Sequence, residues 1–130
     1  MHILLATDAD WVVDEVGAAV GGSDITIVVC RDGRDVAPYV ANRAPDIAVL
    51  DLQSGTMGGM AVTMDLRLDE SSGRLPHVPV LMLLDRDVDI HLAKRSGAQG
   101  WLVKPLDPIR LKKAVTEVAS GRCYAEALSE

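Results

Sequence analysis

The sequence contains no phenylalanine, and aromatic residues make up only 3% of the chain. A folded core therefore has to be built from valine, leucine, isoleucine, alanine and methionine. Such residues are plentiful, because hydrophobic residues form 48% of the sequence, which excludes an intrinsically disordered chain. The length of 130 residues is that of one ordinary domain with its own core.

Cysteine and histidine are also scarce, and their positions exclude the common metal motifs. Cys30 and Cys123 lie far apart, and neither belongs to a cluster with the spacing of metal ligands. His2, His77 and His91 are scattered along the chain and form no metal-binding motif. We therefore expect two unpaired thiols in the reducing environment of the cytosol.

Basic residues are fewer than acidic ones, with 13 Lys and Arg against 19 Asp and Glu and a net charge of −6. The pairs Lys94-Arg95 and Lys112-Lys113 are isolated, so the sequence predicts no surface for nucleic acid. No hydrophobic run is long enough to cross a bilayer. The N-terminus also lacks the basic segment of a signal peptide, and the expected location is cytoplasmic.

Five short hydrophobic runs alternate with segments of helical periodicity. The runs are continuous rather than alternating, which is typical of parallel strands covered on both faces. Strands are expected at 2–7, 25–30, 47–52, 78–84 and 100–103, and helices at 10–20, 33–44, 59–70, 87–97 and 107–120. This order predicts an α/β fold, (βα)5, with one domain over residues 1–120 and a short tail at 121–130.

Some helices carry recognisable ends and faces. Asp10 is the expected N-cap of the first helix, and Asp107 is the expected N-cap of the last. In the third helix, Met60, Met64 and Leu68 follow one another at intervals of four residues. This spacing predicts that the three side chains form the buried face of that helix.

Polar residues stand at the ends of three predicted strands. Thr7 and Asp8 follow the first strand, Asp51 ends the third, and Lys104 follows the fifth. Each alone would be an ordinary solvated residue, but parallel strands bring their carboxyl ends to one edge, where ligands of such sheets bind. Two carboxylates suit Mg²⁺, and a lysine can balance the charge of phosphoryl oxygens. The sequence contains no glycine-rich nucleotide loop and no nucleophile triad that would compete with this site.

Two segments of the chain resemble the receiver domains of two-component response regulators. "PDIAVLDLQSGTMGG" is similar to the segment around the phosphoacceptor, and "SGAQGWLVKPLD" is similar to the segment that ends in the Lys-Pro pair of that family. The resemblance extends from Ile3 to about Ala119. It implies a flavodoxin-like doubly wound parallel sheet with strand order 2-1-3-4-5.

The resemblance also implies roles for residues at the carboxyl edge. Asp51 would accept a phosphoryl group from a histidine kinase or a phosphotransfer protein. Asp8, Asp51 and the backbone carbonyl of Gln53 would bind Mg²⁺, and Lys104 would contact the phosphoryl group. The bond between Lys104 and Pro105 would be cis.

Several positions at this edge depart from the pattern of the family. Thr7 replaces one of a pair of acidic residues, which predicts weak binding of Mg²⁺. Leu84 stands where receivers carry the hydroxyl that contacts the phosphoryl group. Asp85 either adds a negative charge to the site or turns outward to cap the next helix. Trp101 holds the aromatic switch position and is expected to be partly exposed.

These matches and departures favour an atypical, stand-alone receiver that acts by binding another protein. Asp51 would be weakly phosphorylated, or binding would be independent of phosphorylation. The expected contact surface comprises the fourth helix, the fifth strand and the fifth helix, around His91, Lys94, Trp101 and Lys112. A homodimer is a further alternative, and no effector domain is expected after residue 120.

The residues at this edge would also suit an enzyme. Asp51 would then be the nucleophile of a Mg²⁺-dependent aspartyl-phosphate phosphatase or phosphotransferase. The sequence shows no second general acid and leaves no room for a cap domain. We therefore expect no enzymatic activity beyond self-phosphotransfer and autodephosphorylation at Asp51. Flavin binding is excluded by the acidic loop "TDADW", which would repel a phosphate.

Overall fold

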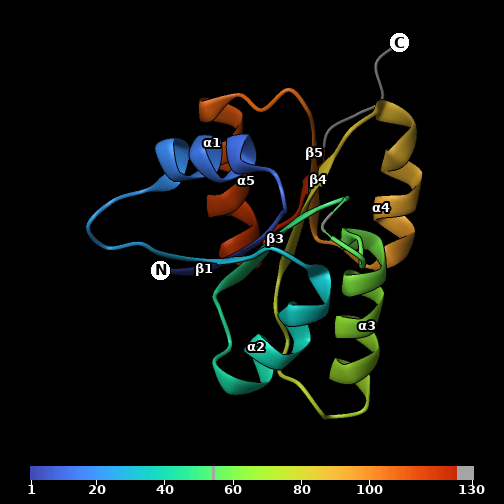
Figure 1. The fold of residues 1–130 in the computed structure, drawn as a ribbon. Coiled ribbons are helices and arrows are strands. Elements are labelled where there is room, and N and C mark those ends of the chain that lie inside the picture. The colour runs from blue at the N-terminus through green and yellow to red at the C-terminus, as the bar shows by residue number, and fades with distance from the viewer. Residues whose placement is uncertain (54, 126–130) are drawn as a thin grey trace.

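The structure, a computed structural model, describes residues 1–53 and 55–125 (Figure 1). In this part of the chain one parallel sheet is formed by β1 (His2–Ala6), β2 (Thr26–Cys30), β3 (Ile47–Asp51), β4 (Val80–Leu84), β5 (Gly100–Val103) and β6 (Tyr124–Ala125). The strands lie in the order β2-β1-β3-β4-β5-β6, and all neighbouring pairs are parallel. The predicted flavodoxin-like order 2-1-3-4-5 is therefore confirmed, with a further short strand beside β5.

The helices cover both faces of the sheet. They are α1 (Asp10–Val20), α2 (Val36–Asn42), α3 (Gly59–Ser71), α4 (Ile90–Ser96) and α5 (Pro108–Ala119). α1 and α5 lie on one face, and α2, α3 and α4 lie on the other (Figure 1). Successive residues of a strand point to opposite faces, so Ile3 and Leu5 pack under α1 and α5, whereas Leu4 and Ala6 pack against α2 and α3. β1, β3 and β4 are buried along their whole length, and their sequences are hydrophobic except for His2 and Asp51.

The predicted N-cap of α5 is confirmed, whereas the predicted N-cap of α1 is wrong, although α1 covers the predicted residues. Asp107 is the N-cap of α5, and its carboxylate accepts hydrogen bonds from two backbone N–H groups of the first turn, at 2.8 and 3.2 Å. Asp10 is the first residue of α1, and Ala9 holds the N-cap position. The Asp10 carboxylate pairs with Arg31 at 2.7 Å, because the end of β2 brings a cation next to the start of α1.

The second and fourth predicted helices each begin with a 3-10 turn and are shorter than expected. The turns cover Gly33–Asp35 before α2 and Asp87–Asp89 before α4. Pro38 lies in the first turn of α2, where the N–H that proline lacks has no partner within the helix. Gly97 ends α4 with a φ of 92°, a left-handed conformation that favours glycine.

The predicted buried face of α3 is wrong. Met64 and Leu68 are 56% and 62% exposed, whereas Val62 and Leu66 are buried. At the first residue of α3, Gly59, a Cβ would lie only 2.6 Å from the backbone oxygen of Asp51. The glycine lets the start of α3 approach the end of β3 closely. Val62 and Leu66, rather than Met64 and Leu68, pack with the hydrophobic residues of β1, β3 and β4.

The chain returns to the sheet after α5, which the sequence does not predict. Gly121 turns the backbone with a φ of 87°, and β6 then pairs with β5. Tyr124 lies opposite Gly100, and Ala125 lies opposite Trp101. A strand of two residues has too short a hydrophobic pattern to be recognised, and residues 126–130 of the predicted tail lie outside the described residues.

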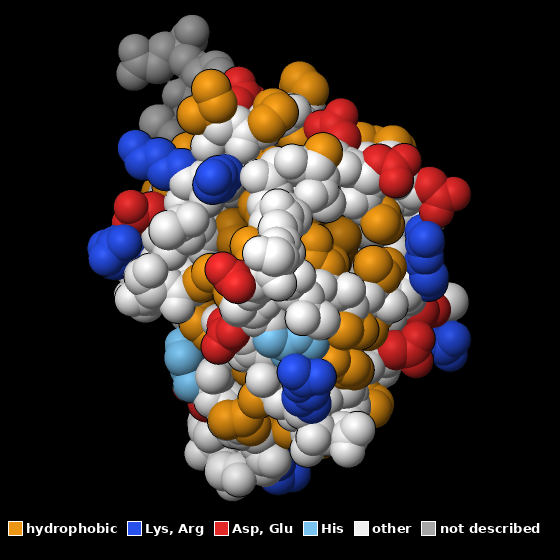
Figure 2. Space-filling model, turned by 90° about the vertical axis from the view of Figure 1, so that its left-hand side faces the viewer, with side chains coloured by type: hydrophobic (Ala, Val, Ile, Leu, Met, Phe, Trp, Pro, Cys, Tyr) orange, Lys and Arg blue, Asp and Glu red, His pale blue; other side chains and the backbone are white. Residues whose placement is uncertain are grey.

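The surface and the helices carry further information about the class of protein. Among the described residues, no helix is both long enough and hydrophobic enough to cross a membrane. On the side of the molecule shown in Figure 2, Lys and Arg side chains lie scattered among Asp and Glu, with small hydrophobic areas between them. This face therefore has no broad basic patch of the kind that binds nucleic acid.

Candidate functional site

Asp51 lies at the carboxyl end of β3, between the ends of β1 and β4, and its side chain is only 3% exposed. Both of its carboxylate oxygens have partners. The Thr7 hydroxyl donates a hydrogen bond to Oδ2 at 2.8 Å, and the Lys104 ammonium donates to Oδ1 at 2.7 Å. A buried carboxylate needs such partners, because an unpaired charge is costly away from water. The structure thus brings together three residues that the sequence places at this edge.

Lys104 is shared between two carboxylates. In addition to its contact with Asp51, its ammonium donates to Asp85 Oδ1 at 2.9 Å. The ammonium also lies 5.4 Å from the centroid of the Trp11 ring, within range of a cation–π contact. The predicted ion pair between Lys104 and Asp51 is confirmed, and the Lys104-Pro105 peptide bond is cis, as the family resemblance implies.

The charges around Lys104 determine its protonation. Its side chain is 14% exposed, and this burial by itself lowers its pKa. The hydrogen bonds and negative charges of Asp51 and Asp85 outweigh burial and hold the pKa of Lys104 above its usual value. Lys104 therefore carries a full positive charge at neutral pH, placed directly against the carboxylate of Asp51.

The sequence left open whether Asp85 adds a negative charge to the site or caps the next helix, and the structure shows the first of these. Its side chain is 37% exposed and turns toward Lys104. The 3-10 turn that follows is capped by other residues, because Arg86 is its N-cap and Asp89 closes the capping box. Asp85 thus adds a second negative charge beside the Asp51–Lys104 pair.

The loop after β3 is held by two aspartates from neighbouring strand ends. Asp8 accepts a hydrogen bond from the backbone N–H of Gly55 at 3.1 Å. Asp32 accepts from the backbone N–H of Thr56 at 3.1 Å and from its hydroxyl at 3.0 Å. Gly55 has a φ of +66°, a left-handed conformation that favours glycine and that proline cannot adopt.

Asp32 is a residue of this site that the sequence analysis missed. Its carboxylate accepts backbone hydrogen bonds from Arg34 and Thr56, and these contacts lower its pKa to about 2. The signal was present in the sequence, because Asp32 follows the end of β2 just as Asp8 follows the end of β1. The rule that polar residues at strand ends share one edge would have included it.

The donor set at this edge fits a weakly held Mg²⁺. Asp8, Asp51 and the backbone carbonyl of Gln53 would hold the ion, and carboxylate and carbonyl oxygens are the ligands it prefers. Across residues 1–53 and 55–125, no group of three or more His, Cys, Asp or Glu side chains could hold a metal. Both oxygens of Asp51 also have protein partners already. When bound, the ion would supply positive charge that offsets the charge of a phosphoryl group.

A third carboxylate should strengthen metal binding at this edge. Replacing Thr7 with aspartate should raise the affinity for Mg²⁺ about tenfold or more, because it adds negative charge and oxygen ligands. The measurement is a fluorescence titration of Trp11, which lies beside Lys104, in a Trp101→Phe background that leaves a single tryptophan. The control Thr7→Ser keeps the hydroxyl and should leave the affinity unchanged. Saturation of the wild type at micromolar Mg²⁺ would contradict this account.

The two positions of the usual switch are both part of the core. Leu84 is fully buried and packs with Met82, Ile90 and Trp101 in a cluster beneath α4. Trp101 is only 7% exposed, so the expectation of a partly exposed side chain is wrong. The physical reason is that α4 covers its ring and the ammonium of Lys94 lies 5.8 Å from the ring centroid.

Comparisons with known proteins identify the family. The model of the response regulator receiver domain matches residues 3–116. The chain therefore belongs to the family of response regulator receiver domains, which act in two-component signalling.

Similar proteins agree with this assignment. The chain is 24% identical to Protein PilH of Pseudomonas aeruginosa, over 92% of this chain and 98% of PilH. It is 32% identical to the nitrate/nitrite response regulator NarL of Escherichia coli, over 82% of this chain but only 49% of NarL, so it spans about half the length of that relative. The crystal structure of the chemotaxis response regulator CheY4 of Vibrio cholerae has the same fold, with 24% identity and a TM-score of 0.77 over 90% of this chain and 97% of that chain.

Proposed function

We propose that this receiver domain accepts a phosphoryl group at Asp51 only to a low extent and acts by binding a protein partner. The phosphoryl donor would be a histidine kinase or a phosphotransfer protein. The proposal rests on the hydrogen bonds of Asp51. Thr7 and Lys104 each donate to one of its two carboxylate oxygens, and the ammonium of Lys104 also donates to Asp85. The Asp51 carboxylate can therefore act as an acceptor, but its contacts with Thr7 and Lys104 disfavour phosphoryl transfer to it.

The restraint on Asp51 has two physical components. An oxygen of Asp51 has to attack phosphorus, forming an O–P bond as the bond between phosphorus and the donor breaks. That oxygen must first give up its contact with Thr7 or with Lys104. The second component is electrostatic, because Asp85 faces the same ammonium that would balance the phosphoryl charge. A like charge a few ångströms away costs on the order of several kcal/mol before screening, and the partial exposure of Asp85 reduces this cost.

Transmission of a phosphoryl signal to the surface is also impaired. A ligand shifts a conformational equilibrium only if it interacts differently with the two conformations. In receivers that contact is made by a hydroxyl, and Leu84 has none. Leu84 and Trp101 are instead packed in one buried hydrophobic cluster. These features support an output that depends little on phosphorylation.

The test measures phosphoryl occupancy directly. Purified protein is incubated with acetyl phosphate and Mg²⁺, and intact mass gives the phosphorylated fraction. We expect a small fraction in the wild type, none in Asp51→Asn, and a several-fold larger fraction in the double variant Leu84→Thr, Asp85→Ala. In the double variant Lys104 no longer has a carboxylate partner at position 85, and threonine at position 84 supplies the hydroxyl that contacts the phosphoryl group in receivers.

A matched control separates the role of Asp85 from a general change of charge. Asp87→Ala removes a nearby carboxylate that has no ion pair among the described residues, and its occupancy should equal that of the wild type. The proposal would be refuted by a wild type that becomes mostly phosphorylated. Phosphorylation that persists in Asp51→Asn would show that another residue is the acceptor.

A further inference from the structure

The methionine stripe of α3 forms one side of a groove. α3 and α4 lie side by side on the same face of the sheet (Figure 1). Two adjoining hollows between these helices, of about 350 and 430 Å³, share Met64 and Ser96 as lining residues. Together they form a surface that we call the α3–α4 groove. Its lining includes Met60, Met64 and Leu68 of α3 and Leu92, Arg95 and Ser96 of α4.

Hydrophobic side chains in this groove are open to solvent. Met64, Leu68 and Leu92 are 56%, 62% and 43% exposed. A group of exposed hydrophobic side chains on one surface commonly marks a site of binding to another molecule. Met60 is half-buried and also packs against the buried cluster that contains Leu84, so the groove adjoins that cluster.

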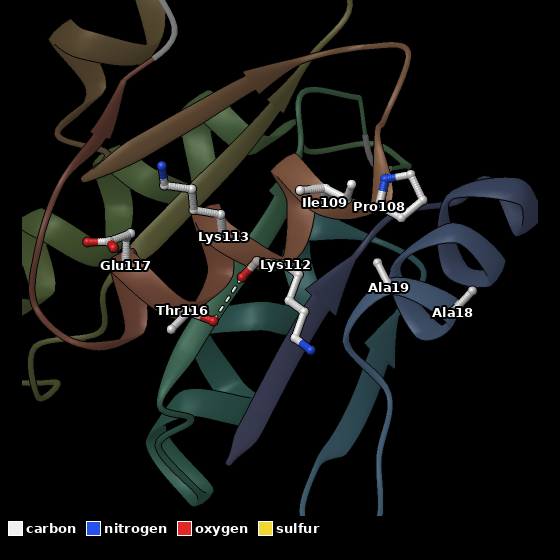
Figure 3. A pocket seen from close by; sticks show the side chains of 8 residues that line it. All are labelled: Ala18, Ala19, Pro108, Ile109, Lys112, Lys113, Thr116 and Glu117. Carbon is white, nitrogen blue, oxygen red and sulfur yellow. Dashed lines mark hydrogen bonds between the residues drawn. The ribbon is translucent and has the colours of Figure 1, made fainter.

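The contact surface that the sequence suggests lacks its expected centre. That surface was expected around His91, Lys94, Trp101 and Lys112. The structure buries Trp101 beneath α4. It places Lys112 on the side of α5 that faces α1, in a hollow that Ala19 also lines (Figure 3). The exposed hydrophobic side chains next to α4 lie instead on its other side, in the α3–α4 groove.

The shape and spacing of the groove suit a helix. Met60, Met64 and Leu68 recur at intervals of four residues, so their side chains follow one side of α3. Side chains that a second helix carries at intervals of three and four residues pack into a groove with this spacing. Methionine is unbranched and flexible, so Met60 and Met64 can adapt to the side chains of a partner.

The two sides of the groove differ in charge. Arg95 lines it on α4, and Asp65 lines it on α3. Both are exposed, and neither has an ion-pair partner in the part of the chain that the structure describes. A helix in the groove is therefore best matched if it offers a carboxylate on the side of α4 and an ammonium on the side of α3.

We propose that the α3–α4 groove binds an amphipathic helix of another protein, with acidic residues along one edge of its hydrophobic face and basic residues along the other. The hydrophobic face covers Met64, Leu68 and Leu92, and the two edges pair with Arg95 and Asp65. This inference rests on the proposed action through a protein partner, and it names the binding surface and the chemistry of that partner.

Two synthetic peptides test the groove on the full chain. Both are helices of about 18 residues with leucines on one face. The first carries glutamates along one edge of that face and lysines along the other, and the second carries lysines along both edges. Calorimetry should show that the wild type binds the first peptide about fivefold more tightly, because the second places a lysine against Arg95. Arg95→Glu should reverse this order, since both sides of the groove are then acidic.

Variants of exposed residues locate the binding surface. Met64→Ser and Leu68→Ser should each weaken binding of the first peptide about tenfold or more, because each removes hydrophobic contact area. Ile109→Ser removes a hydrophobic side chain of α5 that is 80% exposed, and Lys112→Glu reverses a charge on the same helix. These two controls should leave binding unchanged. Amide shifts in NMR spectra should change at residues 60–71 and 90–96.

The outcomes separate this inference from the proposed function. It is overturned if neither peptide binds the wild type in the millimolar range, or if Met64→Ser and Ile109→Ser have equal effects, and the phosphoryl occupancy of Asp51 keeps its own test. With beryllofluoride and Mg²⁺ as a phosphoryl mimic, we expect the same affinity for the first peptide. A tenfold change would refute an output that depends little on phosphorylation, while the groove would remain the binding site.

Discussion

Replacing Lys104 with methionine should lower the free energy of unfolding by about 3 kcal/mol at neutral pH. The Lys104 ammonium is the cation that contacts both Asp51 and Asp85, at 2.7 and 2.9 Å. Its removal leaves the buried carboxylate of Asp51 beside a second negative charge. Asp51→Asn should cost much less, because Lys104 keeps Asp85 as its partner. Urea denaturation of the two variants measures this asymmetry.

The pH dependence of stability provides a second measurement of the same pair. The pKa of Lys104 is raised in the folded protein, so its stabilising contribution is complete below the unfolded value of 10.5 and is lost as the pH rises through the folded value. The stabilities of the wild type and Lys104→Met should therefore converge above pH 10.5. As a control, Lys94→Met removes an exposed ammonium near the Trp101 ring and should cost less than about 1 kcal/mol. Equal costs for Lys104→Met and Lys94→Met would contradict the prediction.

Arg67→Met should destabilise the protein by about 3 kcal/mol, because it leaves several partly buried acceptors without donors. Arg67, on α3, donates to the backbone oxygens of Gly97 and Val78, at 2.9 and 3.0 Å. It also donates to the side-chain oxygen of Gln99, which accepts in turn from the backbone N–H of Val80 at 2.8 Å. One guanidinium therefore joins α3 to the segments before β4 and β5. Methionine keeps most of the hydrophobic length of the side chain but none of these donors.

A matched arginine on the surface makes this prediction specific. Arg74 pairs with Asp69 at 3.0 Å but is 65% exposed, so Arg74→Met should change stability by less than about 1 kcal/mol. The double variant Arg67→Met, Gln99→Ala should cost less than the sum of the single changes, since the two residues share a hydrogen bond. Hydrogen exchange should speed up at the backbone N–H of Val80. Equal effects of Arg67→Met and Arg74→Met would show that the buried network contributes little.

The sheet and its carboxyl edge could be predicted because their signals are local. Each buried strand is a hydrophobic run; Asp51 ends one run and Lys104 directly follows another. The parallel arrangement of the strands therefore brings the two side chains together. The start of the last helix could be placed from Asp107, since an N-cap acts on the turn that follows it.

Features that depend on distant contacts could not be predicted from the sequence. The buried face of α3 is the one whose Val62 and Leu66 pack with residues of β1, β3 and β4, and these contacts with distant strands leave no mark on the local periodicity. The network of Arg67 joins residues that are 11 to 32 positions away along the chain. Trp101 is buried because α4 covers it, although an aromatic residue at that position suggested exposure.

The short strand β6 also affects how the sheet meets other polypeptide chains. An open lateral strand exposes backbone N–H and C=O groups that can pair with a strand from another molecule, which is a route to aggregation. β6 occupies this position beside β5 at Gly100 and Trp101, and the N–H of Tyr124 donates to the backbone oxygen of Gln99 at 3.1 Å. β2 remains the lateral strand at the opposite end of the sheet, where Thr26 is exposed. Strand addition by a foreign peptide is therefore blocked at this part of β5 by the chain itself, whereas β2 is a longer lateral strand of five residues.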